Sequence, residues 1–99
     1  MSYQVRYTKA AKDDIVRLYG FLLEQDPAAA RKALDKIEKG ISFLQDFPFT
    51  CRKALPEDPF LREMIISYGA KGYVVLFEIE NPQTVTILAL RHQREEDYH

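Results

Sequence analysis

The residues best suited to chemistry stand near the end of the chain. An apolar, β-branched segment over residues 84–90 ends in a cluster of planar cationic and aromatic side chains, namely Arg91, His92, Arg94 and Tyr98. Arginine offers a fork of donors that matches phosphate or carboxylate oxygens, and histidine changes its charge near neutral pH. Because a core strand would support these groups rigidly, the pattern predicts a site that recognises an anionic or polar target. The alternative is a solvated tail after the last strand.

Arg62 is a further cationic candidate, within a predicted strand over residues 61–68. If the last three predicted strands form a meander, the first and third run parallel to each other. Arg62 near the start of one and Arg91 near the end of the other then lie at opposite ends of the sheet. The two arginines converge only if the last strand takes another position in the sheet. A structural role for Arg62 is the alternative, as an ion pair with Glu63, Glu78 or a carboxylate of the tail.

Several other chemistries lack the residues that they need. One cysteine and two histidines cannot supply a closed four-ligand zinc site, so we expect no metal and no other cofactor. Cys51 has no histidine near it in the sequence to act as its base. No glycine-rich loop is present that would cradle a phosphate, which argues against a nucleotide-binding enzyme. We expect the acidic pairs Asp13–Asp14 and Glu95–Glu96 to lie on solvated surfaces.

Size and charge narrow the class of protein. The 99 residues, 46% of them hydrophobic, predict one globular domain over residues 1–99. The net charge of −1 disfavours direct binding to nucleic acid, because phosphate contacts require a basic face. The apolar runs are as short as strands, which argues against a membrane partner. A single cysteine and no apolar signal core predict a cytoplasmic protein.

The first half of the chain predicts a strand and a helical hairpin. Residues 3–7 alternate in the manner of a strand, with Tyr3, Val5 and Tyr7 on one face. Thr8 then suits a helix N-cap, and apolar residues recur at helical spacing from position 11 to 22 and again from 30 to 44. Asp26 followed by proline ends the first helix and starts the second. So short a turn forces the two helices to pack antiparallel.

The second half predicts a small antiparallel sheet. Proline and phenylalanine between residues 47 and 59 indicate an irregular connector. Strands are predicted over 61–68, 72–80 and 84–91, and their short connections make them a three-stranded antiparallel meander. The predicted fold class is therefore α+β, with the helical hairpin covering one face of a three- or four-stranded sheet. Its other face and its edges remain available to a partner.

The order and spacing of several short motifs resemble the RelE/ParE toxin superfamily of bacterial type II toxin–antitoxin systems. Each motif is weak by itself, but together they span nearly the whole chain. They are Ala11-x-x-Asp14-Ile15, Pro27-Ala28-Ala29, Phe47-Pro48, Leu61-Arg62-Glu63, Tyr73-Val74-Val75-x-Phe77 and His92-Gln93-Arg94-Glu95.

The resemblance implies a toxin that a cognate antitoxin neutralises in a hetero-oligomer. ParE-type members inhibit DNA gyrase and are associated with plasmid stabilization, whereas RelE-type members are metal-independent endoribonucleases that cut mRNA on the ribosome. The tail and the balanced charge are closer to the ParE type. We therefore predict a gyrase inhibitor without catalysis of its own, which binds its target through Arg62, Arg91, His92, Arg94 and Tyr98. In the RelE-type alternative, Arg62 and Arg94 bind the phosphorane while Tyr98 or His92 transfers protons.

Overall fold

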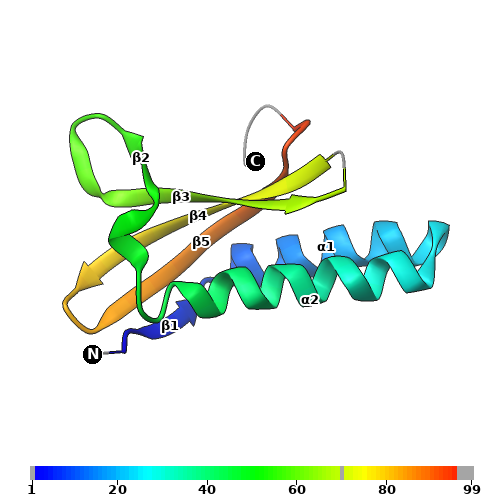
Figure 1. Ribbon diagram of the computed structural model, residues 1–99, viewed down its shortest axis with the longest axis horizontal. Coiled ribbons are helices and arrows are strands. Elements are labelled where there is room, and N and C mark those ends of the chain that lie inside the picture. The colour runs from blue at the N-terminus through cyan, green and yellow to red at the C-terminus, as the bar shows by residue number, and fades with distance from the viewer. Residues whose placement is uncertain (1, 70, 96–99) are drawn as a thin grey trace.

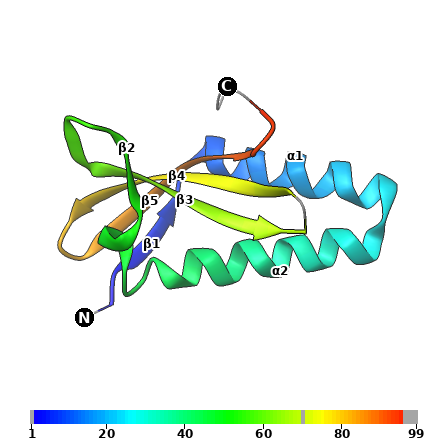
Figure 2. The same cartoon turned by 45° about the horizontal axis from the view of Figure 1, so that its top comes forward.

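The computed structural model describes residues 2–69 and 71–95, apart from the side chain of Lys71. Two helices lie side by side and cover one face of a twisted five-stranded sheet (Figures 1 and 2). In chain order the elements are β1 (Gln4–Tyr7), α1 (Lys9–Gln25), α2 (Pro27–Phe43), a 3₁₀ turn (Pro48–Thr50), β2 (Arg52–Leu55), β3 (Asp58–Tyr68), β4 (Lys71–Asn81) and β5 (Thr84–His92). The predicted α+β class and the antiparallel helical hairpin are confirmed.

The predicted caps explain where the helices begin. The Thr8 side chain accepts a hydrogen bond from the Ala11 amide at 3.1 Å and donates one to the Leu88 carbonyl at 3.0 Å. Asp26 is the single residue between the two helices, and it accepts from the amides of Ala28 and Ala29, which fixes the start of α2. Each helix therefore begins at the residue type that satisfies its free amides.

The sheet has the strand order β1-β5-β4-β3-β2. The meander β3-β4-β5 is antiparallel as predicted, but β1 adds to β5 in parallel, so the complete sheet is mixed. The expectation of three or four strands was too low, because the connector contains a strand. β2 pairs with β3 antiparallel through the register Arg52↔Glu63 and Lys53↔Arg62. The nearby prolines do not interrupt the pairing, because Pro56 lies in the turn between β2 and β3 and Pro59 precedes the first β3–β4 pair at Leu61.

The core lies between the helices and the sheet. Phe77, Ile87 and Leu90 are fully buried there, and the apolar stripes of both helices pack onto them. A Cβ atom on Gly40 would lie 2.8 Å from Cδ1 of Ile66, so this glycine allows α2 to approach β3 closely. Within the described residues, neither helix is both long and apolar enough to cross a membrane.

Candidate pocket at the end of β5

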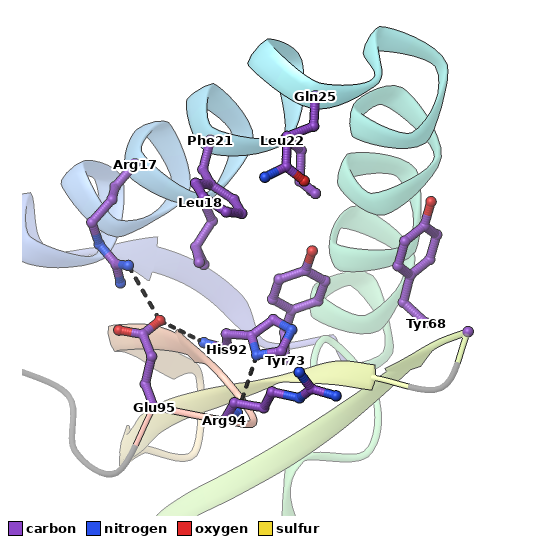
Figure 3. A pocket seen from close by; sticks show the side chains of 11 residues that line it. Arg17, Leu18, Phe21, Leu22, Gln25, Tyr68, Tyr73, His92, Arg94 and Glu95 are labelled. Carbon is purple, nitrogen blue, oxygen red and sulfur yellow. Dashed lines mark hydrogen bonds and ion pairs between the residues drawn. The ribbon is translucent and has the colours of Figure 1, made fainter.

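A pocket of about 660 Å³ opens where β5 ends beside α1 (Figure 3). Its walls are mostly apolar or aromatic, and two of the predicted site residues, His92 and Arg94, lie on it. The lining comes from α1, the β3–β4 hairpin, and the end of β5 with the turn that follows it. It consists of Arg17, Leu18, Phe21, Leu22, Gln25, Tyr68, Gly69, Tyr73, His92, Arg94 and Glu95. An apolar cavity with a small number of polar groups is the usual form of a binding site.

His92 is held in one orientation by its neighbours. It lies opposite Tyr73 in the β4–β5 register, and the two rings pack edge to face with centroids 5.6 Å apart. Its Nδ1 atom accepts a hydrogen bond from the Arg94 amide at 3.1 Å. Since an accepting nitrogen carries no proton, the neutral ring has its proton on Nε2. The backbone of Arg94 thus fixes the tautomer of the neighbouring imidazole.

Two carboxylates, those of Asp14 and Glu95, lie on the α1 side of the turn that follows β5. Arg17 contacts both of them. Glu95 Oε1 accepts from the His92 amide at 3.0 Å and from Arg17 Nη1 at 3.2 Å. Arg17 Nη2 lies 3.7 Å from Oδ1 of Asp14, whose Oδ2 accepts from the Leu90 amide at 2.9 Å. Asp14 is only 3% exposed, so its expected place on a solvated surface was wrong. The carboxylate is buried because it serves as the acceptor for a strand amide.

The same contacts control the acidity of Glu95. Partial burial by itself raises the pKa of this carboxyl, but the hydrogen bond from the His92 amide and the Arg17 guanidinium outweigh it. The pKa of Glu95 is consequently held below its ordinary value.

This lowered pKa predicts a particular dependence of stability on pH. The contribution of Glu95 to folding is fully present above the unfolded-state pKa of about 4.3, and it is lost as pH falls through the lower folded-state pKa. Glu95→Gln cannot titrate. The difference in free energy of unfolding between the parent chain and this variant should therefore stay constant above about pH 5 and shrink on further acidification. Urea unfolding at a series of pH values measures it.

Glu57→Gln, in the exposed turn between β2 and β3, is the matched control for the substitution. A Glu95→Gln difference that is independent of pH, or that grows toward acid, would contradict the assignment of this ion pair.

Arg62 lies away from the pocket and is bound to the backbone. Its Nε donates to the Pro59 carbonyl at 2.7 Å, and its Nη1 donates to the carbonyls of Cys51 at 2.8 Å and Phe49 at 3.2 Å. The guanidinium also stands over the Phe49 ring, 5.3 Å from its centroid. These contacts fasten the 3₁₀ turn and the start of β2 to β3. They differ from the carboxylate partners that the sequence suggested for a structural Arg62.

The sheet register separates Arg62 from the pocket. Arg62 is level with Phe77 of β4, whereas His92 is level with Tyr73, whose partner in β3 is Ile66. The separation along the sheet is thus four residues, or roughly 13 Å at 3.3 Å per residue. Across the sheet, Arg62 on β3 is also two strands away from His92 on β5. Arg62 and the His92–Arg94 turn do not converge.

Arg91 and Tyr98 complete the predicted set. Arg91 Nη1 donates to the carbonyl of Glu95 at 2.6 Å, and to those of His92 and Gln93 at 3.4 Å, so this side chain holds the turn closed. Tyr98 lies outside the described residues.

Cys51 does not have the environment of a reactive thiol. Burial raises the pKa of its thiol, although Arg62 and Thr50 act in the opposite direction. Among residues 2–69 and 71–95, no three His, Cys, Asp or Glu side chains lie together as a metal site would require.

Sequence reasoning missed the contribution of α1 to this site. Arg17 and Phe21 sit beside the apolar stripe rather than in it, and Phe21 is 61% exposed. A large apolar residue next to a helix stripe indicates a surface that extends past the core. That signal was present in the sequence. The role of Arg17 was not readable, because its partner Glu95 is 78 positions away.

Comparison with known proteins agrees with this architecture. Residues 5–97 match the family described as ParE toxin of type II toxin-antitoxin system, parDE. Toxin RelE3 of Caulobacter vibrioides is 32% identical over 85 residues, covering 86% of this chain and 88% of that protein. Toxin RelE1 of the same organism is 30% identical over 79 residues, covering 80% and 82%.

A solved structure has a similar fold. The chromosomal ParDE TA system from P. aeruginosa matches with a TM-score of 0.71 and 18% identity, covering 92% of this chain and 96% of that one. The resemblance inferred from the short motifs is therefore confirmed. The chain belongs to the ParE toxin family of type II toxin–antitoxin systems, within the wider RelE/ParE superfamily.

Proposed function

We propose that residues 1–99 form one ParE-like toxin domain that acts in the cytoplasm, inhibits DNA gyrase and is neutralised by a cognate antitoxin. The observation that carries the proposal is the separation of Arg62 from the turn with His92 and Arg94. A metal-free ribonuclease must gather cations and a proton donor around one phosphate. Arg62 and His92 are roughly 13 Å apart along the sheet, and Arg62 is bound to three carbonyls, which supports target binding over phosphate cleavage.

The pocket fits a protein target better than a phosphate. Its lining includes Leu18, Leu22 and the exposed Phe21, and Arg94 and His92 line it as well. Exposed apolar surface beside an arginine is the composition of a protein-binding hot spot. We assign target contact to Arg94 and His92, with Arg91 holding the turn beneath them. Tyr98 belongs to the same proposal as a tail contact.

A RelE-like mRNA endonuclease is the second candidate, because both relatives named above are called RelE toxins. In that case Arg62 and Arg94 would bind the cleaved phosphate and Tyr98 or His92 would transfer protons. Replacing either arginine by alanine would then abolish cutting of ribosome-bound message.

The antitoxin is assigned to the exposed apolar side of the helical hairpin. Val16 is 71% exposed on α1, and Leu23, about two helical turns further along, is 40% exposed. Both outer strands of the described sheet, β1 and β2, are only four residues long, and neither has a second strand neighbour among the described residues. An antitoxin segment that is first helical and then extended would cover these apolar residues and could add a strand.

One paired measurement in cells separates the two functions. The chain is expressed without its antitoxin, plasmid supercoiling is followed on gels, and translated mRNA is mapped by primer extension. We expect growth arrest with relaxed or cleaved plasmid and intact message, and co-expression of the antitoxin should restore both growth and supercoiling. Cuts at codon positions in ribosome-bound message, with supercoiling unchanged, would contradict the proposal.

A further inference from the structure

The outer side of β5 loses its strand neighbour halfway along. β1 ends at Tyr7, opposite Ile87, and the Thr8 amide makes the last backbone bond of that pairing to the Ile87 carbonyl. Amides alternate in direction along a strand. Since the Gln93 amide donates to the Gly72 carbonyl in β4, the amides of Leu90 and His92 point to the other, unpaired side. Each requires an acceptor, and no strand within residues 2–69 and 71–95 supplies one.

Two carboxylates replace the missing strand. Asp14 of α1 accepts from the Leu90 amide at 2.9 Å, and Glu95 accepts from the His92 amide at 3.0 Å. Two neighbouring negative charges, one of them buried, need a cation between them. Arg17 provides it, 3.7 Å from Asp14 and 3.2 Å from Glu95. We call Asp14, Arg17 and Glu95 the carboxylate clamp.

The carboxylate clamp fixes the turn that carries the site. Glu95 is tied to α1 by Arg17, and its carbonyl is held by Arg91 at 2.6 Å. With both ends of residues 92–95 fixed, the Arg94 amide is placed 3.1 Å from His92 Nδ1. The orientation of the imidazole and the direction of Arg94 therefore depend on a contact made from another element.

We propose that Arg17 is a positioning residue, which acts through Glu95 to fix how His92 and Arg94 are presented to the target of the toxin. The inference rests on the proposed function, in which this end of the sheet contacts gyrase. It adds that helix α1 controls the site through a side chain that need not touch the target.

A double-variant cycle tests this with purified chain and gyrase. Arg17→Ala should raise the concentration that halves supercoiling by about tenfold in the parent background, and by less than about twofold in the Arg94→Ala background. Arg17→Lys keeps the charge and should recover much of the activity. Arg31→Ala, which removes an exposed Arg31–Asp35 pair on α2, is the matched control and should change nothing. Equal losses in both backgrounds would overturn the proposal.

Amide hydrogen exchange measured by NMR gives a readout that does not involve the target. In Arg17→Ala the His92 amide should exchange about tenfold faster, whereas the Gln93 amide, bonded to Gly72 of β4, should be unchanged. Unchanged exchange at His92 would overturn the proposal.

If the parent chain fails to inhibit gyrase, the proposed function fails, and the double-variant cycle is run on cutting of ribosome-bound mRNA. Non-additivity there supports the positioning role, and additivity overturns it.

Discussion

Replacing Asp14 by alanine should lower the free energy of unfolding by about 2–3 kcal/mol. The same substitution at the adjacent Asp13 should cause a smaller loss. Asp14→Ala removes the acceptor of the Leu90 amide, which lies in the core beside α1. A buried amide without a partner costs about 1–3 kcal/mol, and Arg17 loses its contact with Asp14 while it keeps the ion pair with Glu95. For a chain of this size the melting temperature should fall by roughly 10–20 °C.

The neighbouring Asp13 is the matched control. It is exposed and pairs with Lys9 at 3.1 Å on the same helix, so Asp13→Ala should cost less than about 0.5 kcal/mol. Asp14→Asn keeps an oxygen that can accept from Leu90 but loses the charge, and should give an intermediate loss. Urea unfolding of the three variants measures these values. Similar stabilities for Asp13→Ala and Asp14→Ala would show that the buried carboxylate has no structural role.

Replacing Arg94 by alanine should reduce gyrase inhibition by about 10- to 100-fold with little change in stability. Arginines at the centre of protein interfaces contribute about 2 kcal/mol or more, and each 1.4 kcal/mol is about tenfold in affinity. Arg94 is exposed, and the bond to His92 Nδ1 comes from its backbone, which alanine retains. The effect should therefore fall on target binding alone. A supercoiling titration with the folded variant measures it.

Arg6→Ala, an exposed arginine on β1, controls for loss of positive charge and should leave inhibition unchanged. Equal inhibition by the parent chain and Arg94→Ala would remove this side chain from the target contact. A loss in Arg94→Ala that is accompanied by unfolding would instead make it structural.

Much of the fold was predictable because local chemistry determined it. Thr8 and Asp26 cap the helices as their residue types indicate, and the spacing of apolar residues identified both buried stripes. β2 was missed because prolines near it were interpreted as a sign of irregular chain. The parallel pairing of β1 with β5 joins residues 80 positions apart, and no local pattern encodes that pairing.

The site was only partly predictable for a related reason. His92 and Arg94 were identified from their types at the end of a strand, and they do line one pocket. Asp14 was expected on a wet surface, because in the sequence it looks the same as Asp13. Its burial follows from where β1 ends, which leaves the Leu90 amide without a strand partner. A side chain that replaces a missing strand can be recognised only when the register is known.

Purified gyrase and relaxed plasmid, in a reaction that contains no ribosomes, test the proposed inhibition of gyrase most directly. Adding the purified chain should stop supercoiling and trap gyrase on cleaved DNA, and prior addition of the cognate antitoxin should prevent both effects. Continued supercoiling at every toxin concentration, together with cutting of message by the same preparation once ribosomes are supplied, would contradict gyrase inhibition.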